Sequence, residues 1–387
     1  MKRVAIYLLS IVMLLNVTGC KKKNAVENPE EIVTETYKND PITAAAKMVE
    51  GMRTREKIYQ LFITTPEMLL GGEQRKEAGD TAAEVLANSP VGGILYCGGN
   101  IENKEQLTKL LQTMDENTKI PLFQMIDEED GTEVLAAMDG MGVSAVPSRK
   151  EIGEGKDPQR AFDTAKTLAT EIKALGFNVH LAPVADMPSE RDEVGIGDRA
   201  FGTDAALVST MVGQAVLGSH EGGVATVVKH FPGYGSSIVN AKNGRAESNR
   251  TYEEMQMHEL LPLKAGIDAA TDFVMVSHMI HASLTKTNME CSMSTNVMKT
   301  ILRDTMGFPN IIMTDSLSKD AITAYYSAGA AAVTALEAGA DMLFLPADLD
   351  AAYAAIDGAM KSGRITEERL NQSVARILKV KLMRGIL

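Results

Sequence analysis

The chain has 387 residues, of which 45% are apolar and 23% charged, and this composition can bury a sizeable core and excludes a disordered protein. The formal net charge of −12 argues against a nucleic-acid-binding protein, because such proteins need a cationic face. Three cysteines are too few for a disulfide framework, and the 32 Gly and 13 Pro residues follow no repeating period.

Residues 1–19 have the features of a signal peptide, since Lys2 and Arg3 precede an apolar run over 4–15 that is too short to span a bilayer comfortably. The Val-Thr-Gly-Cys sequence at 17–20 resembles a bacterial lipobox, so we expect cleavage before Cys20 and lipid on its side chain. The alternative is an ordinary cleavage site at which Cys20 is incidental. Residues 20–43 predict a flexible tether, which would hold the folded part at a cell membrane, outside the cytoplasm.

From residue 44 onward, short apolar runs of β-forming residues alternate with amphipathic segments of helical period. The apolar runs predict strands over 60–64, 91–96, 122–126, 178–181, 224–228, 273–276, 311–313 and 342–345. The helical patterns between and after them include 103–114, 158–175, 204–221, 252–267, 295–306, 321–338 and 366–383.

Strands that alternate with helices indicate crossover connections and a parallel sheet. Eight such units favour an α/β fold of the closed (β/α)8 TIM-barrel type over an open doubly wound sheet. The sequence also lacks, after its first strand, the glycine-rich phosphate loop that open nucleotide-binding sheets carry. Because the composition does not change after residue 44, we expect one barrel domain over 44–387.

Polar residues follow five consecutive predicted strands, at the end of the barrel where this fold keeps its active sites. Taken singly, each has a structural alternative, such as a helix N-cap for an aspartate or a salt bridge for a lysine. Taken together, they indicate a catalytic or binding site. They are Asp127, Asp186, Lys229 with His230, His278 and Asp315.

The segment Lys-His-Phe-Pro-Gly-Tyr-Gly at 229–235 resembles the signature of glycoside hydrolase family 3, in its single-domain β-N-acetylglucosaminidase branch. Ala-Pro-Val-Ala-Asp at 182–186, Arg-Ala-Phe-Gly at 199–202, Thr-Asp-Ser-Leu at 314–317 and Arg-Leu-Asn-Gln-Ser-Val at 369–374 agree in the same order. The resemblance covers nearly everything from about residue 44. It implies a retaining hydrolase that removes terminal β-linked N-acetylhexosamine from cell-wall or environmental glycans without a cofactor.

The resemblance also implies roles for single residues. Asp315 matches the nucleophile, which must be an ionised carboxylate facing the anomeric carbon. A carboxylate with cationic and imidazole donors can grip several hydroxyls of one sugar ring. The implied sugar-binding residues are Asp127, Arg199, Lys229 and His230, with Met275 and His278 lining the same pocket.

Three stretches depart from the family pattern. The histidine that acts as general acid/base in the family corresponds to Lys242 in this chain, and the aspartate partner of that histidine corresponds to Asn240. A lysine with its ordinary pKa near 10.4 is a poor proton donor at neutral pH unless burial or cationic neighbours lower that pKa. Leu135 stands at an arginine position, and Lys319 replaces a methionine after the nucleophile. The acidic residues that could substitute for the missing acid are Glu128, Glu129, Asp130 and Glu133.

Two further functions stay open on the sequence. The chain could be a sugar-binding lipoprotein without catalysis, or a glycoside phosphorylase in which phosphate replaces water and Lys242 lies near its path. A metal site is disfavoured, because His278 and His281 are spaced three apart without a third ligand at matching spacing.

Overall fold

The structure is a computed structural model that describes residues 40–129, 134–189, 192, 194–239 and 245–387. The expected signal peptide over 1–19, the lipid site at Cys20 and most of the tether over 20–43 lie outside the described residues. The first described helix, α3 (Pro41–Gly51), begins within the last residues of the expected tether. Among the described residues, no helix combines the length and the apolarity needed to cross a membrane.

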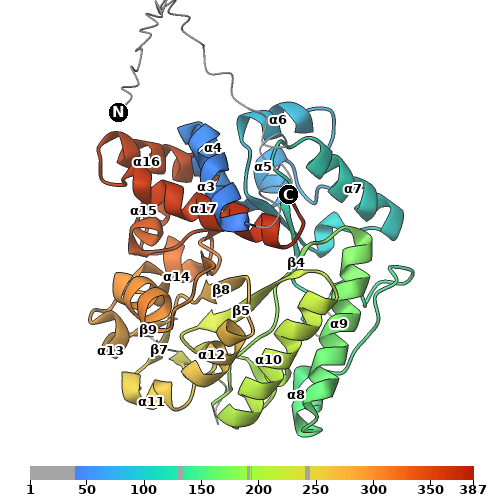
Figure 1. Cartoon of the computed structure of the whole chain (residues 1–387), viewed down its shortest axis with the longest axis vertical. Coiled ribbons are helices and arrows are strands. Elements are labelled where there is room, and N and C mark those ends of the chain that lie inside the picture. Colours follow the sequence, from blue (N-terminus) through green and yellow to red (C-terminus); the bar gives the residue numbers. More distant parts are fainter. Residues whose placement is uncertain (1–39, 130–133, 190–191, 193, 240–244) are drawn as a thin grey trace, which may run out of the picture.

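Parallel strands form a ring at the centre of the fold, as the sequence predicted for a (β/α)8 barrel (Figure 1). Their order is β10-β8-β5-β4-β3-β2-β1-β11, and a parallel bridge between Met313 and Met342 joins the first strand of this series to the last. The strands are β1 (Phe62–Thr64), β2 (Gly93–Tyr96), β3 (Phe123–Ile126), β4 (Val179–His180), β5 (Ala225–Phe231), β8 (Phe273–Val276), β10 (Ile311–Thr314) and β11 (Leu343–Phe344).

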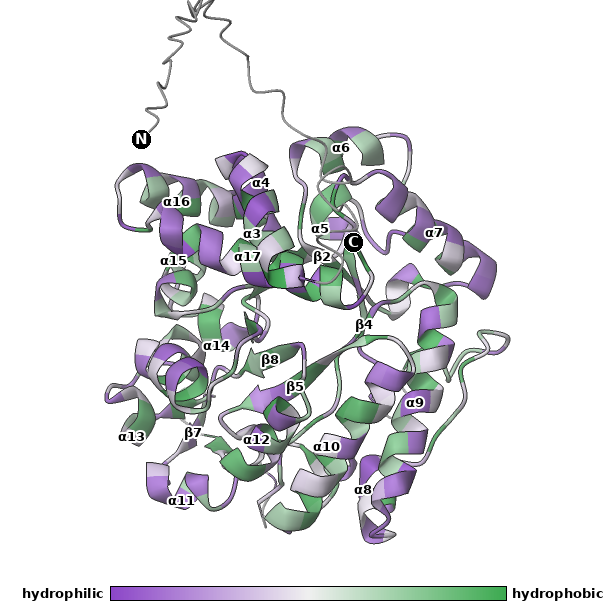
Figure 2. Ribbon diagram, in the orientation of Figure 1, coloured by the Kyte–Doolittle hydropathy of each residue, from purple (hydrophilic) through white to green (hydrophobic). Residues whose placement is uncertain are grey.

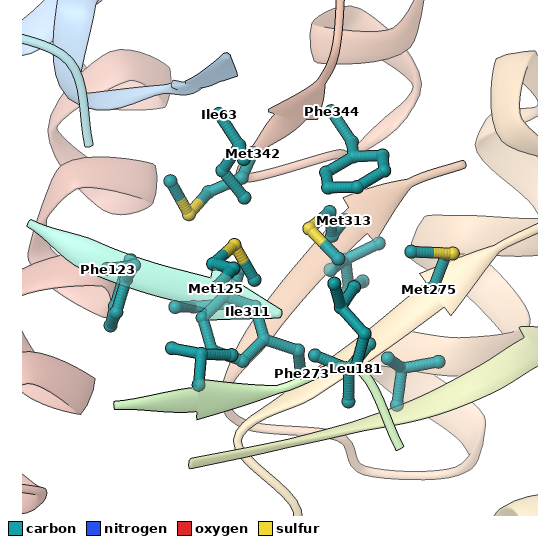
Figure 3. Close-up of a cluster of buried hydrophobic side chains, with 14 of the residues drawn as sticks. Ile63, Phe123, Met125, Leu181, Phe273, Met275, Ile311, Met313, Met342 and Phe344 are labelled. Atoms are coloured by element: carbon teal, nitrogen blue, oxygen red, sulfur yellow. The ribbon is translucent and has the colours of Figure 1, made fainter. Parts of the chain in front are cut away.

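The interior of the ring is filled by apolar side chains from different strands (Figure 3). Side chains in a strand alternate between its two faces, so residues two apart point the same way. On β3 the series Phe123 and Met125 leads to Asp127, and on β10 the series Ile311 and Met313 leads to Asp315. The alternation that builds the core therefore also aims these two carboxylates into the mouth of the barrel.

Helices pack around the ring, and their ribbons carry both hydrophobic and hydrophilic residues (Figure 2). The buried residues are mostly apolar, as in α9 (Pro158–Leu175), where Leu168, Ile172 and Leu175 are buried. Gly92, just before β2, shows how tight this packing is, because a Cβ there would lie 2.1 Å from the carbonyl oxygen of Gln60. After α3 the helices are α4 (Thr54–Gln60), α5 (Pro66–Leu70), α6 (Ala82–Asn88), α7 (Lys104–Glu116), α8 (Arg149–Glu154), α9 (Pro158–Leu175), α10 (Ala205–Glu221), α11 (Tyr252–Gln256), α12 (Leu260–Asp268), α13 (Ala282–Thr285), the π-type helix η5 (Asn296–Thr305), α14 (Asp320–Thr323), α15 (Ala328–Ala338), α16 (Leu349–Lys361) and α17 (Glu367–Met383).

Two of the expected helices are broken in the structure. The pattern over 252–267 divides into α11 and α12, because Pro262 has no N–H to donate to the carbonyl of His258. The pattern over 321–338 divides into α14 and α15, where the hydroxyl of Ser327 accepts a hydrogen bond from the N–H of Ala330 and caps the second helix. The expected helix over 158–175 is confirmed from end to end, with Asp157 as its N-cap.

A second, small sheet that the sequence did not predict lies beside the barrel. It consists of β6 (Ile238–Val239), β7 (Ala246–Ser248) and β9 (Ile280–His281). β6 and β7 are antiparallel, and β7 runs parallel to β9, so the segment after β5 is tied to the segment after β8. Figure 1 shows β7 and β9 near α11 and α13.

Candidate active site

The expected site residues meet at the carboxyl ends of the strands. Asp127 directly follows β3, Lys229 and His230 are the fifth and sixth residues of β5, and Asp315 directly follows β10. Strand register places Lys229 beside Met275 of β8. Arg199 reaches the same region from the loop after β4, so the barrel brings together residues that are far apart in the sequence.

Glu129 is the centre of a buried ion cluster. The sequence predicted Glu129 only as a possible substitute acid and did not predict these ion pairs. Its carboxylate, with 2% of the side chain exposed, accepts two hydrogen bonds from the Arg199 guanidinium, at 2.7 and 2.8 Å. The Nζ of Lys229 lies 2.6 Å from Glu129 Oε1 and 2.8 Å from Asp127 Oδ1. Arg149 approaches the same carboxylate at 3.7 Å. Glu129 therefore holds the two cations in fixed positions beside Asp127.

The ion pairs of this cluster keep Glu129, Arg199 and Lys229 in their charged forms. Burial alone would raise the pKa of Glu129, but Lys229 and the arginines outweigh it, and the pKa lies well below its usual range. The hydrogen bonds that Arg199 donates to Glu129 raise the pKa of Arg199, and the carboxylates of Asp127 and Glu129 outweigh burial and raise the pKa of Lys229. An ionised, ion-paired Glu129 cannot donate a proton at neutral pH, so the expectation that it could replace the missing acid is not supported.

Glu128 binds the backbone of the loop that follows β3, and its role as a substitute acid stays a prediction. The Glu128 residue is fully buried, and its Oε2 accepts the N–H groups of Val134 and Leu135 at 3.0 and 2.7 Å. Leu135, which stands where the family pattern has arginine, is itself fully buried among apolar residues. The other two possible substitutes, Asp130 and Glu133, lie outside the described residues.

His230 is oriented by Asp186, which follows β4. Asp186 Oδ2 lies 2.7 Å from His230 Nδ1 and accepts the backbone N–H of His230 at 3.1 Å. Its other oxygen accepts the N–H of Tyr234 at 2.6 Å, and the rings of Tyr234 and His230 are 5.8 Å apart. A buried carboxylate that fixes Nδ1 leaves Nε2 as the ring nitrogen available to a ligand.

Asp315 is buried, and both of its carboxylate oxygens have a donor. Oδ1 accepts the N–H of Ser316 at 2.7 Å, and Oδ2 accepts a hydrogen bond from the ammonium of Lys319 at 2.7 Å. Burial alone would raise the pKa of Asp315, but the Lys319 ammonium holds it below its ordinary value. Asp315 does not cap a helix, since Lys319 occupies the N-cap position of α14. It is an ionised carboxylate in the mouth of the barrel.

His278 and Met275 line the wall between Lys229 and Asp315. His278 Nδ1 lies 2.6 Å from the Ser292 hydroxyl, and its Nε2 lies 2.8 Å from the Ser316 carbonyl, so the ring fixes the turn after Asp315. Burial lowers the pKa of His278 and favours the neutral ring. Met275 is 3% exposed and packs with the interior residues shown in Figure 3. Its place in the fold is that of a packing residue in the barrel interior.

The segment expected to carry the acid/base group is described only at its two ends. Asn240 and Lys242 lie outside the described residues. After them, Arg245 forms an ion pair with the fully buried Glu290, which also accepts a hydrogen bond from the Tyr326 hydroxyl at 3.1 Å. The guanidinium of Arg245 lies 4.1 Å from the centre of the Tyr325 ring. These contacts anchor the end of the segment to the loops after β8 and β10.

The structure is a closed parallel barrel whose mouth holds an ionised aspartate together with a cluster of charged side chains and an imidazole, an arrangement that barrel glycosidases can use. Residues 53–380 match the glycosyl hydrolase family 3 N terminal domain, and the chain belongs to this family of glycoside hydrolases. The resemblance drawn from the sequence is thereby confirmed at the level of the family.

Relatives in this family extend the comparison. A "Beta-hexosaminidase" of Nitrosomonas eutropha is 30% identical over 295 residues, which are 74% of this chain and 83% of that protein. The structure of a family 3 β-N-acetylglucosaminidase from Paenibacillus sp. str. FPU-7 is 31% identical with a TM-score of 0.79, and the match covers 87% of this chain but 63% of that one. M tuberculosis LpqI is 27% identical with a TM-score of 0.74, and the match covers 86% of this chain and 95% of that one.

Proposed function

We propose that the protein hydrolyses terminal β-linked N-acetylhexosamine, or a closely related sugar, by a retaining mechanism with Asp315 as the nucleophile. The observation that carries this proposal is the buried, ionised Asp315, which faces the mouth of the barrel across from Asp127, Arg199, Lys229 and His230. The family membership and the β-hexosaminidase relatives support the same substrate class.

The binding groups suit one hexose ring. The half-exposed Asp127 carboxylate accepts hydroxyl hydrogens, while Lys229, Arg199 and His230 Nε2 donate to hydroxyl oxygens. Glu129 and Asp186 hold these donors in place before the substrate arrives, so little side-chain entropy is lost on binding.

The chemistry follows from an ionised carboxylate facing the anomeric carbon. Asp315 forms a covalent ester with that carbon as the bond to the leaving oxygen breaks, and positive charge on the sugar in the transition state is stabilised by the carboxylate. Water then cleaves the ester and restores Asp315. With Asn240 and Lys242 at the acid/base positions, protonation of the leaving oxygen is the weak step, which is typically worth about 10²–10⁴ in rate.

The test uses 4-nitrophenyl N-acetyl-β-glucosaminide, because nitrophenolate departs without a proton. We expect slow turnover, labelling of Asp315 by a 2-deoxy-2-fluoro glycoside, and loss of both in Asp315→Asn. Asp320→Asn is the matched control, since Asp320 is an exposed carboxylate five residues away. Absence of turnover and of labelling in the unaltered protein would contradict the proposal.

The double substitution Asn240→Asp with Lys242→His tests the cause of the weak step. We expect it to raise the rate on natural alkyl glycosides far more than on the nitrophenyl substrate. Binding of N-acetylglucosamine without turnover, and without any gain from the double substitution, would instead support a sugar-binding protein.

Phosphorolysis is the second candidate, and the Lys319–Asp315 pair favours it. When Asp315 becomes an ester it loses its negative charge, so the half-exposed ammonium of Lys319 loses this counter-ion beside the anomeric carbon. An anionic acceptor such as phosphate is attracted to that position. A product that is sugar 1-phosphate in phosphate buffer, in place of free sugar, would identify this reaction.

We also propose that lipid on Cys20 anchors the protein to a membrane on its extracytoplasmic side, a proposal supported by the sequence over 1–20 alone. The wild-type protein should sediment with membranes, and Cys20→Ser should release it to the soluble fraction. Sedimentation of both proteins, or of neither, would contradict the anchor.

A further inference from the structure

A chain of hydrogen bonds leads from the segment after β9 to the residue that follows Asp315. The hydroxyl of Ser292 lies 2.6 Å from Nδ1 of His278. Nε2 of the same ring lies 2.8 Å from the carbonyl oxygen of Ser316. Ser292 belongs to the short turn η4 (Cys291–Met293), and the sequence did not predict a role for it. All of these side chains are buried, so the bonds are shielded from water.

The chemistry of the partners fixes where the hydrogen atoms of this chain lie. A carbonyl oxygen only accepts, so Nε2 of His278 carries a hydrogen and donates it to Ser316. Burial lowers the pKa of His278, so the ring is neutral and its Nδ1 carries no hydrogen. The Ser292 hydroxyl therefore donates to Nδ1. A single tautomer of the ring satisfies both contacts, and the hydroxyl of Ser292 selects it.

Ser316 joins this chain of hydrogen bonds to the nucleophile. Its N–H donates to Oδ1 of Asp315 at 2.7 Å, while its carbonyl is held by His278. The N–H of Asp315 itself donates to the carbonyl of Val276 at 2.9 Å, so the backbone is also fixed just before the carboxylate. Because a residue has only two soft backbone dihedrals, a carbonyl held by His278 keeps the N–H of Ser316 aimed at Oδ1.

The other end of the chain is fixed by the backbone around Ser292. The N–H of Ser292 donates to the carbonyl of Ser277 at 3.1 Å, and the N–H of Cys291 donates to the carbonyl of Met279 at 2.9 Å. Ser292 is fully buried, and in the part of the chain that the structure describes its hydroxyl bonds only to His278. The hydroxyl that orients the ring is therefore itself held in one place.

The two oxygens of Asp315 are held with unequal strength. Oδ2 accepts from Lys319, whose side chain is 55% exposed, and exposed ion pairs hold a geometry only weakly. Oδ1 accepts from the N–H of Ser316, whose direction is fixed inside the protein. The direction of the carboxylate therefore depends mainly on the buried chain of hydrogen bonds.

We propose that Ser292 and His278 are a positioning pair, which acts through Ser316 to aim the carboxylate of Asp315 at the anomeric carbon. This inference rests on the proposed function and deepens it. The pair makes and breaks no bond of the substrate, but a displacement of the nucleophile by about 1 Å can cost about 10²-fold in rate. The proposed sugar-binding groups follow or belong to other strands, so losing the pair should lower kcat and leave KM nearly unaltered.

Ser292→Ala tests the first link, because it removes the hydroxyl that selects the tautomer of His278. We expect kcat for 4-nitrophenyl N-acetyl-β-glucosaminide to fall at least about tenfold, while KM changes by less than about twofold. The rate at which a 2-deoxy-2-fluoro glycoside labels Asp315 should fall by a similar factor, since labelling reports the attack itself. Ser294→Ala is the matched control, because Ser294 is a buried serine of the same segment outside this chain of hydrogen bonds, and it should keep kcat.

Two substitutions of His278 test the second link. His278→Leu removes the donor to the carbonyl of Ser316, whereas His278→Gln supplies an amide nitrogen at about the same place. We expect kcat to be lowest in His278→Leu and at least about fivefold higher in His278→Gln, with similar KM values. Both variants lose the imidazole, so a recovery that follows the donor is not expected if His278 only packs. Circular dichroism checks that each variant folds.

The outcomes separate the positioning pair from the proposed function. An unchanged kcat in Ser292→Ala, or a loss that appears in KM instead of kcat, would overturn the positioning pair alone. So would a His278→Gln variant that is no faster than His278→Leu, and this comparison decides the matter if Ser292→Ala does not fold. Failure of the unaltered protein to turn over the glycoside and to be labelled would overturn the proposed hydrolase activity and, with it, the pair.

Discussion

Lys381 is a fully buried lysine of α17, and replacing it with methionine is expected to stabilise the barrel below pH 7. Its Nζ donates to Oε1 of Gln60 at 3.0 Å and lies 4.9 Å from the centre of the Phe123 ring. Burial lowers the pKa of Lys381 to about 7, against an ordinary value of 10.5, and Asp115 opposes this shift only in part. The folded protein therefore carries a poorly solvated ammonium in acid solution.

The sign of the pH dependence follows from the two pKa values. Below pH 7 Lys381 is charged in both states, so the full penalty of burying the charge is present. Between pH 7 and 10.5 the folded state releases the proton while the unfolded state keeps it, so stability rises with pH. The gap between the two values corresponds to a penalty on the order of 5 kcal/mol.

Methionine has a similar length and removes this penalty. Gln60 Oε1 then loses its donor, which costs about 1–3 kcal/mol, while Gln60 Nε2 keeps its hydrogen bond to the carbonyl of Pro90 at 2.8 Å. At pH 6 we expect Lys381→Met to raise the free energy of unfolding by roughly 2–4 kcal/mol. At pH 9 the advantage falls by about 3 kcal/mol, because the wild-type lysine is then neutral when folded.

Urea unfolding at pH 6 and pH 9 measures both effects. Lys361→Met is the control, since Lys361 is exposed on α16 and its change should leave the midpoint nearly unaltered. A difference between wild type and Lys381→Met that does not change with pH would refute the assignment of a lowered pKa to Lys381. So would a methionine variant that is less stable than the wild type at pH 6.

Three further substitutions test the site. Glu129→Gln leaves its buried cationic partners with an uncharged neighbour, so urea unfolding should show a loss of about 3–5 kcal/mol, and an unchanged midpoint would contradict the role of the cluster. Lys319→Met removes the ammonium beside Asp315, so the pKa of Asp315 should rise. The acidic limb of the pH profile of kcat/KM should then move up by at most about one pH unit. An unmoved acidic limb would mean that the exposed Lys319 is not paired with Asp315 in solution. Asp186→Asn should lower kcat/KM for the nitrophenyl glycoside about tenfold, because His230 loses the carboxylate that fixes its ring. Full activity of this variant would contradict the role of Asp186.

Much of the barrel was predictable because its signals are local. Apolar runs correspond to each of the eight strands, and the run over 273–276 matches β8 from end to end. Strand positions in turn predicted that Asp127, Lys229, His230 and Asp315 meet at one end, since parallel strands bring their carboxyl ends together. The helix boundaries were less predictable, because the break before α15 has no glycine or proline in the sequence.

The pairings within the site were not predictable in the same way. Nothing in the sequence distinguishes Glu129, which binds Arg199 and Lys229, from Glu128, which binds the backbone of Val134 and Leu135. Both are acidic residues that follow the same strand. Their roles differ in the folded chain, because closure of the ring brings Arg199 and Lys229 beside Glu129, while Glu128 meets the backbone of Val134 and Leu135.

The sequence by itself determined the family, the strands and the residues that reach the mouth of the barrel, because these depend on residue type and on spacing along the chain. The tertiary structure decided which charges are paired, that Glu129 stays ionised, and that Asp186 orients His230. Such properties depend on distances between strands that closure of the ring sets, and on how completely each group is removed from water.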